Sequence, residues 1–141
     1  MYFIKYFISL LLISSILFGD SSNIKNSDIP NIVSLNWLKS NIDNSNLVII
    51  DLRAKKEYEK DHIQNAVNIP GLKSLFDDKF FMPKLDFLKN LFSEAGIDNN
   101  SLVLAYDNGD FIWAARFYWI LETLGHKKVG ILKVGYNDLL K

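Results

Sequence analysis

Four apolar runs of strand length constrain the fold of this chain more than any other feature. Continuous apolar runs of this length are typical of strands that are buried on both faces of a sheet. The runs are NLVIIDLR at 46–53, AVNIP at 66–70, SLVLAYD at 101–107 and KVGILKV at 128–134. Helical patterns separate them, and parallel strands need such crossovers. The sequence therefore predicts an α/β fold with a mostly parallel central sheet flanked by helices on both faces.

Four helices are predicted from caps, helix breakers and the spacing of apolar residues. Ser34 is expected to cap the first helix, and Gly96 to close the third. The fourth is apolar on all sides and has more such surface than one small core usually hides, so we expect Phe111 or Trp113 to be exposed or covered by a partner. The predicted helices span 34–41, 54–61, 83–95 and 111–125, and 72–81 is expected to be a loop.

The first residues predict an export signal rather than part of the fold. Lys5 precedes an apolar run within residues 1–19, and residues 20–31 follow as a polar leader. A basic start, an apolar segment of about 7–15 residues and a small residue such as Gly19 are typical of a secretory signal peptide. We therefore expect an exported, periplasmic or extracytoplasmic protein. The alternative is that residues 1–19 are retained and anchor the chain to a membrane.

Composition excludes several classes of function. The 141 residues include no Cys, which excludes a thiolate nucleophile, a disulfide, an iron–sulfur cluster and a zinc–thiolate site. Basic and acidic residues number 16 each, so the chain offers no cationic surface for nucleic acid. No nucleic-acid partner and no cofactor are expected, and membrane contact is expected only if the N-terminal segment is not cleaved.

The segment DLRAKKEYEKDHIQNAVNIP at 51–70 resembles the signature of the rhodanese superfamily. An Asp-x-Arg strand end is followed by a Glu-Tyr pair, and His-Ile then precedes Ala-x-Asn-Ile-Pro. The matching residues are Asp51, Arg53, Glu57, Tyr58, His62, Ile63, Ala66, Asn68, Ile69 and Pro70. Two departures are Asp61 and Asn65, which stand where the family usually has Gly.

Further motifs resemble the amino-terminal domain of tandem thiosulfate and mercaptopyruvate sulfurtransferases. They are MP at 82–83, GI at 96–97, LVLAYD at 102–107, AAR-x-YW at 114–119 and LGHKKVGILKVG at 124–135. The resemblance implies a rhodanese-like domain over 32–141. It also implies that the catalytic Cys of the tandem family belongs to a second domain, and that Asp107 stands at the corresponding position of this chain.

The loop after Asp107 is the expected site. A carboxylate accepts sulfane sulfur poorly and repels an anionic donor, so no catalytic residue is predicted. Asp110 is expected to be the N-cap of the following helix, where a carboxylate meets free N–H groups. The predicted binding residues are Asp107, Asn108, Gly109, Asp110, Phe111 and Trp113.

Five further residues are expected to hold the structure together. Arg53 and Glu57 are predicted to pair across the turn from strand to helix. His62 is expected to be hydrogen-bonded in a turn, and Arg116 to lie among the aromatic residues of the 111–125 helix. The five are Asp51, Arg53, Glu57, His62 and Arg116.

The leading hypothesis is a non-catalytic structural or binding module of an exported sulfurtransferase. Its expected partner is a Cys-bearing rhodanese domain on another chain, and one alternative is an enzyme that is active only with that partner. Because the chain ends soon after Gly135, we expect a truncated product, a split subunit or a free-standing remnant, and the sequence does not separate these.

Two other hypotheses remain open. Asp51, Asp107 and Asp110 follow adjacent strands and could bind a divalent cation such as Mg²⁺, although solvated or capping carboxylates are the simpler interpretation and no metal ligand is assigned. The other hypothesis is a sulfurtransferase that acts alone by a route without Cys.

Overall fold

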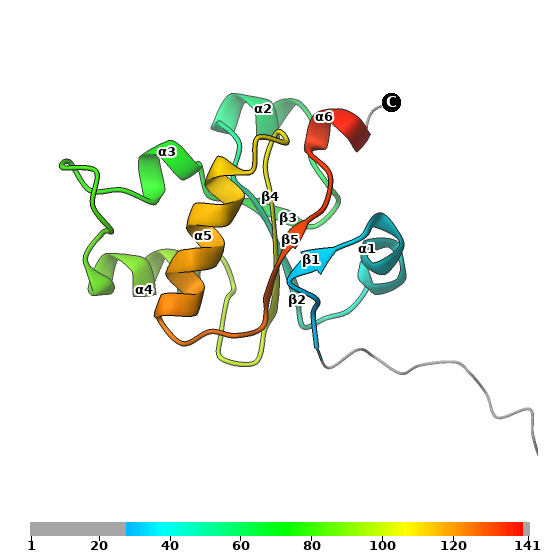
Figure 1. The fold of residues 1–141 in the computed structure, drawn as a ribbon, viewed down its shortest axis with the longest axis horizontal. Coiled ribbons are helices and arrows are strands. Elements are labelled where there is room, and N and C mark those ends of the chain that lie inside the picture. The colour runs from blue at the N-terminus through cyan, green and yellow to red at the C-terminus, as the bar shows by residue number, and fades with distance from the viewer. Residues whose placement is uncertain (1–27, 140–141) are drawn as a thin grey trace, which may run out of the picture.

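A five-stranded sheet forms the centre of the computed structural model, which describes residues 28–139 (Figure 1). The strand order is β1-β5-β4-β2-β3, and every neighbouring pair is parallel. The strands are β1 (Ile32–Val33), β2 (Leu47–Asp51), β3 (Ala66–Asn68), β4 (Leu102–Tyr106) and β5 (Val129–Leu132). The predicted parallel α/β fold is confirmed.

Six helices connect the strands and follow the last one within the described residues. Ser34 caps α1 as predicted, because its side chain accepts a hydrogen bond of 3.2 Å from the N–H of Trp37. The four-residue helix α3 overlaps the start of the segment 72–81, which is predicted to be a loop. The helices are α1 (Leu35–Asn41), α2 (Lys55–Lys60), α3 (Gly71–Ser74), α4 (Leu85–Glu94), α5 (Ile112–Thr123) and α6 (Tyr136–Leu139).

The core lies in two layers, one on each face of the sheet. Alternate residues of β2 enter different layers: Ile50 packs with α4 and α5, whereas Ile49 packs with α1 and β1. All five residues of β4 are buried, because this strand lies between β5 and β2 and is covered on both faces. This double cover explains why the strands read as unbroken apolar runs rather than as alternating patterns.

The α5 helix is too apolar to be buried on every side, as expected. Ala114 and Phe117 are fully buried against the sheet, whereas 37% of Phe111 and 49% of Trp119 are exposed. The expectation that Phe111 is exposed at the mouth of the loop is confirmed, and Trp113 is half-buried.

Part of the segment predicted to be a polar leader belongs to the folded domain. Ile29 is buried in the same layer as α1, and the carbonyl of Asn31 accepts a hydrogen bond from the N–H of Ile131. The predicted signal peptide at 1–19 lies outside the described residues. None of the helices within 28–139 combines the length and the apolar character needed to cross a membrane.

Candidate functional site

The loop between β4 and α5 surrounds the carboxylate of Asp107 with backbone amides. Its Oδ1 accepts hydrogen bonds from the N–H of Gly109 at 2.9 Å and of Phe111 at 3.2 Å, and its Oδ2 accepts one from Ala114 at 3.1 Å. The residue is only 1% exposed. Burial of a charge is costly, but charge-assisted hydrogen bonds and the positive end of the α5 dipole offset that cost. Asp107 therefore fills this amide cradle from within the chain.

The prediction that Asp110 is the N-cap of α5 is wrong. The N-cap residue is Phe111, in a left-handed conformation with φ of 60°, and its side chain makes no capping hydrogen bond. Asp110 is exposed and accepts one hydrogen bond of 3.2 Å, from the N–H of Ile112. The turn through Gly109, which has φ of 115°, brings the carboxylate of Asp107 back under the helix, so the earlier residue takes the deeper donors.

The predicted pair between Arg53 and Glu57 is also absent from the described structure. Arg53 instead forms a bidentate ion pair with Asp51. Its Nε lies 3.0 Å from Oδ1 and its Nη2 lies 2.6 Å from Oδ2, with both side chains buried. The planar fork of the guanidinium matches a carboxylate in this way. Burial alone would lower the pKa of Arg53, but the hydrogen bond and charge of Asp51 raise it.

Tyrosine side chains complete the surroundings of this ion pair. The hydroxyl of Tyr106 donates to Asp51 Oδ2 at 2.6 Å and accepts from the N–H of Ile63 at 3.2 Å. The ring of Tyr136 lies 3.6 Å from the guanidinium carbon of Arg53, a cation–π contact. Burial, followed by the hydrogen bond to Asp51, raises the pKa of Tyr106 well above its usual value. Burial and Asp61 also raise the pKa of Tyr136.

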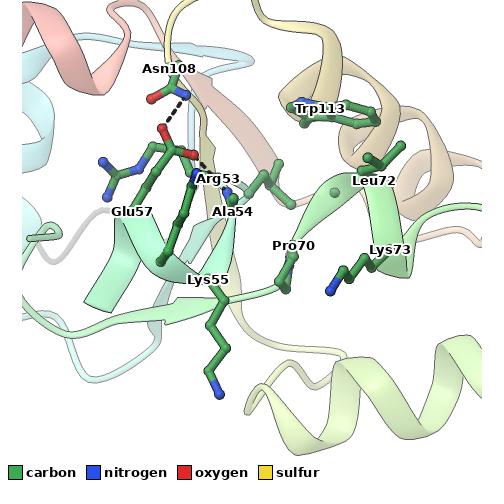
Figure 2. A pocket seen from close by; sticks show the side chains of 12 residues that line it. Arg53, Ala54, Lys55, Glu57, Pro70, Leu72, Lys73, Asn108 and Trp113 are labelled. Atoms are coloured by element: carbon green, nitrogen blue, oxygen red, sulfur yellow. Dashed lines mark hydrogen bonds between the residues drawn. The ribbon is translucent and has the colours of Figure 1, made fainter. Parts of the chain in front are cut away.

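Glu57 joins α2 to the β4–α5 loop. Its Oε1 accepts a hydrogen bond of 3.0 Å from Asn108 Nδ2, and its Oε2 accepts one of 3.1 Å from the N–H of Ala54 (Figure 2). The second bond stabilises the start of α2, and the first fixes the loop residue that follows Asp107. Glu57 therefore links Ala54 and Asn108 rather than the predicted partner Arg53.

The other two residues predicted to be structural, His62 and Arg116, make contacts within the fold. His62 Nδ1 lies 2.8 Å from the carbonyl oxygen of Tyr58, and the two rings stack with centroids 4.0 Å apart. The guanidinium carbon of Arg116 lies 4.6 Å from the ring centroid of Phe76 and 4.8 Å from that of Trp119. Arg116 therefore joins α5 to the segment that follows α3.

A pocket of about 420 Å³ opens beside the loop, between the start of α2, α3 and the first turn of α5 (Figure 2). Of the predicted binding residues, Asn108 and Trp113 line it, whereas Asp107 is buried under the loop. Gly109, Asp110 and Phe111 do not line it. The sequence reasoning missed the contribution of α3, which the Pro70–Gly71 pair after β3 signals. Other lining residues include Arg53, Glu57, Pro70, Leu72 and Lys73.

The proposed cation site receives no support from the described residues. Asp51 is held by Arg53 and Tyr106, and Asp107 by three amides, so neither carboxylate is left for a metal ion. Among residues 28–139, no three acidic or histidine side chains are grouped so that they could hold a metal.

Curated relatives are sulfurtransferases that are much longer than the matched segment. The mitochondrial thiosulfate/3-mercaptopyruvate sulfurtransferase 1 of Arabidopsis thaliana is 31% identical over 117 residues, which cover 74% of this chain and 31% of that protein. The 3-mercaptopyruvate sulfurtransferase of Escherichia coli is 29% identical over 117 residues, which cover 73% of this chain and 41% of the relative. The chain thus spans well under half the length of these relatives.

Solved structures and a family comparison agree on the fold. The E. coli 3-mercaptopyruvate sulfotransferase structure superposes with a TM-score of 0.68 at 28% identity, over 77% of this chain and 47% of that one. A single-domain sulfurtransferase of Saccharomyces cerevisiae has the same fold, with a TM-score of 0.60 at 18% identity over 80% and 90% of the two chains. The rhodanese-like domain family matches residues 34–141. This chain therefore belongs to the rhodanese-like domain family.

Proposed function

We propose that this chain is a non-catalytic rhodanese-like module of a sulfurtransferase system. The observation that carries the proposal is the amide cradle occupied by the carboxylate of Asp107. By its resemblance to the tandem sulfurtransferases, the chain has Asp107 where their catalytic domain has Cys. Family chemistry needs a thiolate that accepts a sulfane sulfur, with nearby N–H groups that stabilise the anion. Here a carboxylate already takes those N–H groups, and the residue is only 1% exposed.

The test is a sulfur-transfer assay of the purified chain with thiosulfate or 3-mercaptopyruvate as donor and cyanide as acceptor. We expect thiocyanate to form no faster than in buffer. Formation that scales with protein concentration and disappears in Asp107→Asn would overturn the proposal. Circular dichroism of the variant separates a loss of activity from a loss of fold.

Export of the module is a second part of the proposal. It is supported by the basic start, the apolar run and Gly19 within residues 1–19. The intact mass of the protein recovered from the periplasm of a bacterial host tests it. We expect a product cleaved near Gly19; a full-length product in the membrane fraction supports the anchor instead.

A second candidate function is an enzyme completed by a Cys-bearing rhodanese domain on another chain. The observation that favours it is that large apolar side chains are exposed at or beside the pocket. Examples are Leu72 at 61% and Ile112 at 59% exposed. Titration of this chain into a purified Cys-bearing rhodanese domain that is its partner should raise the thiocyanate rate at least ten-fold. An unchanged rate of thiocyanate formation, together with no complex of the two chains in analytical sedimentation, would contradict this candidate and favour the non-catalytic module.

A further inference from the structure

The pocket beside the β4–α5 loop has an apolar wall that is held in place by its neighbours. Trp113 of α5 and Leu72 of α3 form one side, and Pro70 lies between them and the start of α2 (Figure 2). The indole of Trp113 packs directly on Gly71, where an added Cβ would lie 2.8 Å from it. Its edge meets the ring of Phe76, with centroids 6.2 Å apart and planes at 84°. A flat ligand would therefore meet a preformed surface, which reduces the entropic cost of binding.

Cations outnumber carboxylates around this wall. Glu57 is the lining carboxylate, and both of its oxygens already accept hydrogen bonds. Arg53 is neutralised by its buried ion pair with Asp51. Lys55 lies 3.5 Å from Glu59 in an exposed pair, which contributes little. The lining cations are Arg53, Lys55, Lys56 and Lys73.

Two of these lysines remain available to a ligand. Within residues 28–139, the ammonium groups of Lys56 and Lys73 have no ion-pair or hydrogen-bond partner. The whole chain has a net charge of zero, so this is a local excess rather than a general one. A pocket with an apolar wall and unpaired cations at its side favours a ligand that has both an apolar part and a negative charge.

We propose that this pocket binds a small organic anion with a flat apolar body. The body lies against Trp113 and Leu72, and a carboxylate, sulfonate or phosphate group faces Lys56 and Lys73. A volume of about 420 Å³ suits a molecule of this kind and is large for an inorganic anion alone. The inference rests on the proposed function and deepens it, because it names the class of molecule that the binding module takes.

The test uses 1-anilinonaphthalene-8-sulfonate, an aromatic sulfonate whose fluorescence rises on binding, with the full chain. N-phenyl-1-naphthylamine, which has nearly the same body without the sulfonate, is the uncharged comparison. We expect saturable 1:1 binding of the sulfonate. The double variant Lys56→Gln/Lys73→Gln should weaken its binding about five-fold or more and leave the amine unchanged. Leu72→Ser should weaken both probes. All three side chains are exposed, so the variants should fold normally.

Matched controls separate the pocket from other surfaces. Lys79→Gln/Lys89→Gln removes two exposed lysines that do not line the pocket, and Phe80→Ala/Phe81→Ala removes two exposed apolar rings that do not line it either. Both controls should bind the sulfonate like the parent chain. The proposal is wrong if the phenylalanine variant loses binding while the Lys56/Lys73 variant keeps it, or if binding is not saturable.

Failure of this inference can be told apart from failure of the proposed function. Thiocyanate formation by the chain alone contradicts the non-catalytic role, whatever the probe does. Probe affinity that is unchanged in the Lys56, Lys73 and Leu72 variants contradicts the ligand site, even when the sulfur-transfer assay detects no thiocyanate.

Discussion

Two buried aspartates at neighbouring strand ends are stabilised in different ways. Asp51 is the last residue of β2 and is neutralised by the guanidinium of Arg53, whereas Asp107 follows β4 and relies on three backbone amides. The first arrangement ties side chains of several elements together. The second needs only the loop that Asp107 itself begins and the first turn of α5, so the conformation of that loop depends on one side chain.

Replacement of Asp107 by Asn should therefore destabilise the chain. In Asn, an NH2 group replaces one of the two carboxylate oxygens. This NH2 group is a donor, so a backbone N–H that bound the oxygen would lose its acceptor and face another donor. We expect the free energy of unfolding in urea to fall by about 2 kcal/mol. Asp110→Asn, at an exposed residue with one weak hydrogen bond, should change it by less than about 0.5 kcal/mol. Equal stability of the two variants would contradict the role given to Asp107.

The sequence indicates that Asp51 and Asp107 lie at the ends of neighbouring strands, but it does not reveal which groups these carboxylates bind. The spacing of Arg53 and Glu57 suggests an i, i+4 pair, which requires both residues to be helical. The helix begins only at Lys55, so Arg53 lies in the bend before it and turns back to Asp51. The cap of α5 was misassigned for a similar reason, because the left-handed residue Phe111 is not visible in a pattern of residue types.

At the scale of elements, the β4–α5 loop is packed against the segment that follows β5. An added Cβ at Gly135 would lie 2.3 Å from the carbonyl oxygen of Asn108 and from the Cα of Gly109. The N–H of Tyr136 also donates to the carbonyl of Asp107 at 2.9 Å. The start of α6 therefore forms one wall of the loop and limits its movement.

Gly135→Ala should force these two segments apart. We expect a loss of about 2–3 kcal/mol in the free energy of unfolding, since backbone atoms cannot make room as a flexible side chain would. Hydrogen exchange of the Tyr136 amide should become faster. Gly96→Ala is the control: its φ of 82° is unfavourable for Ala but an added Cβ meets no atom, so about 1 kcal/mol is expected. A smaller loss for Gly135→Ala than for the control would count against this packing.

Long elements could be predicted from the sequence, whereas two of the short ones, β1 and α3, could not. The buried runs at β2, β4 and β5 and the apolar faces of α4 and α5 extend over enough residues to show a pattern. β1 has two residues and α3 has four, fewer than one repeat of a reliable pattern, and both are fixed by tertiary contacts. The pocket beside α3 was missed for this reason.

At the scale of the whole molecule, one network joins both halves of the sheet to the last helix. Tyr106 of β4 hydrogen-bonds Asp51 of β2, and Arg53 stacks on Tyr136 of α6. Nη2 of Arg53 also donates to the carbonyl of Asp61 at 2.7 Å, beyond the end of α2. Global stability should therefore respond to the ionisation of the tyrosines in this network.

We predict that the stability of the chain falls as the pH rises above about 10. The pKa of Tyr106 is raised in the folded state by burial and by Asp51, while an unfolded tyrosine ionises near pH 10. Above that pH the unfolded chain binds fewer protons than the folded chain, so the free energy of unfolding decreases with pH; below it this contribution is fully present. Urea unfolding between pH 8 and 11 measures the slope.

The Tyr106→Phe variant should lose part of that slope. It should also be less stable at neutral pH, because Asp51 and the N–H of Ile63 each lose a hydrogen-bond partner. Tyr118→Phe, on α5 and outside this network, should keep the parent slope. A slope that is the same in all three proteins would refute the assignment to Tyr106.

The carboxylate under the β4–α5 loop has a consequence for how this domain responds to oxidants and reductants. A Cys side chain in such a loop would change its charge and size when it is oxidised or reduced. The carboxylate of Asp107 does not undergo such changes. Because Asp107 is covalently part of the chain, neither dilution nor turnover removes its carboxylate from the amide cradle. We therefore expect the loop to keep the same shape beside the pocket in oxidising and in reducing surroundings.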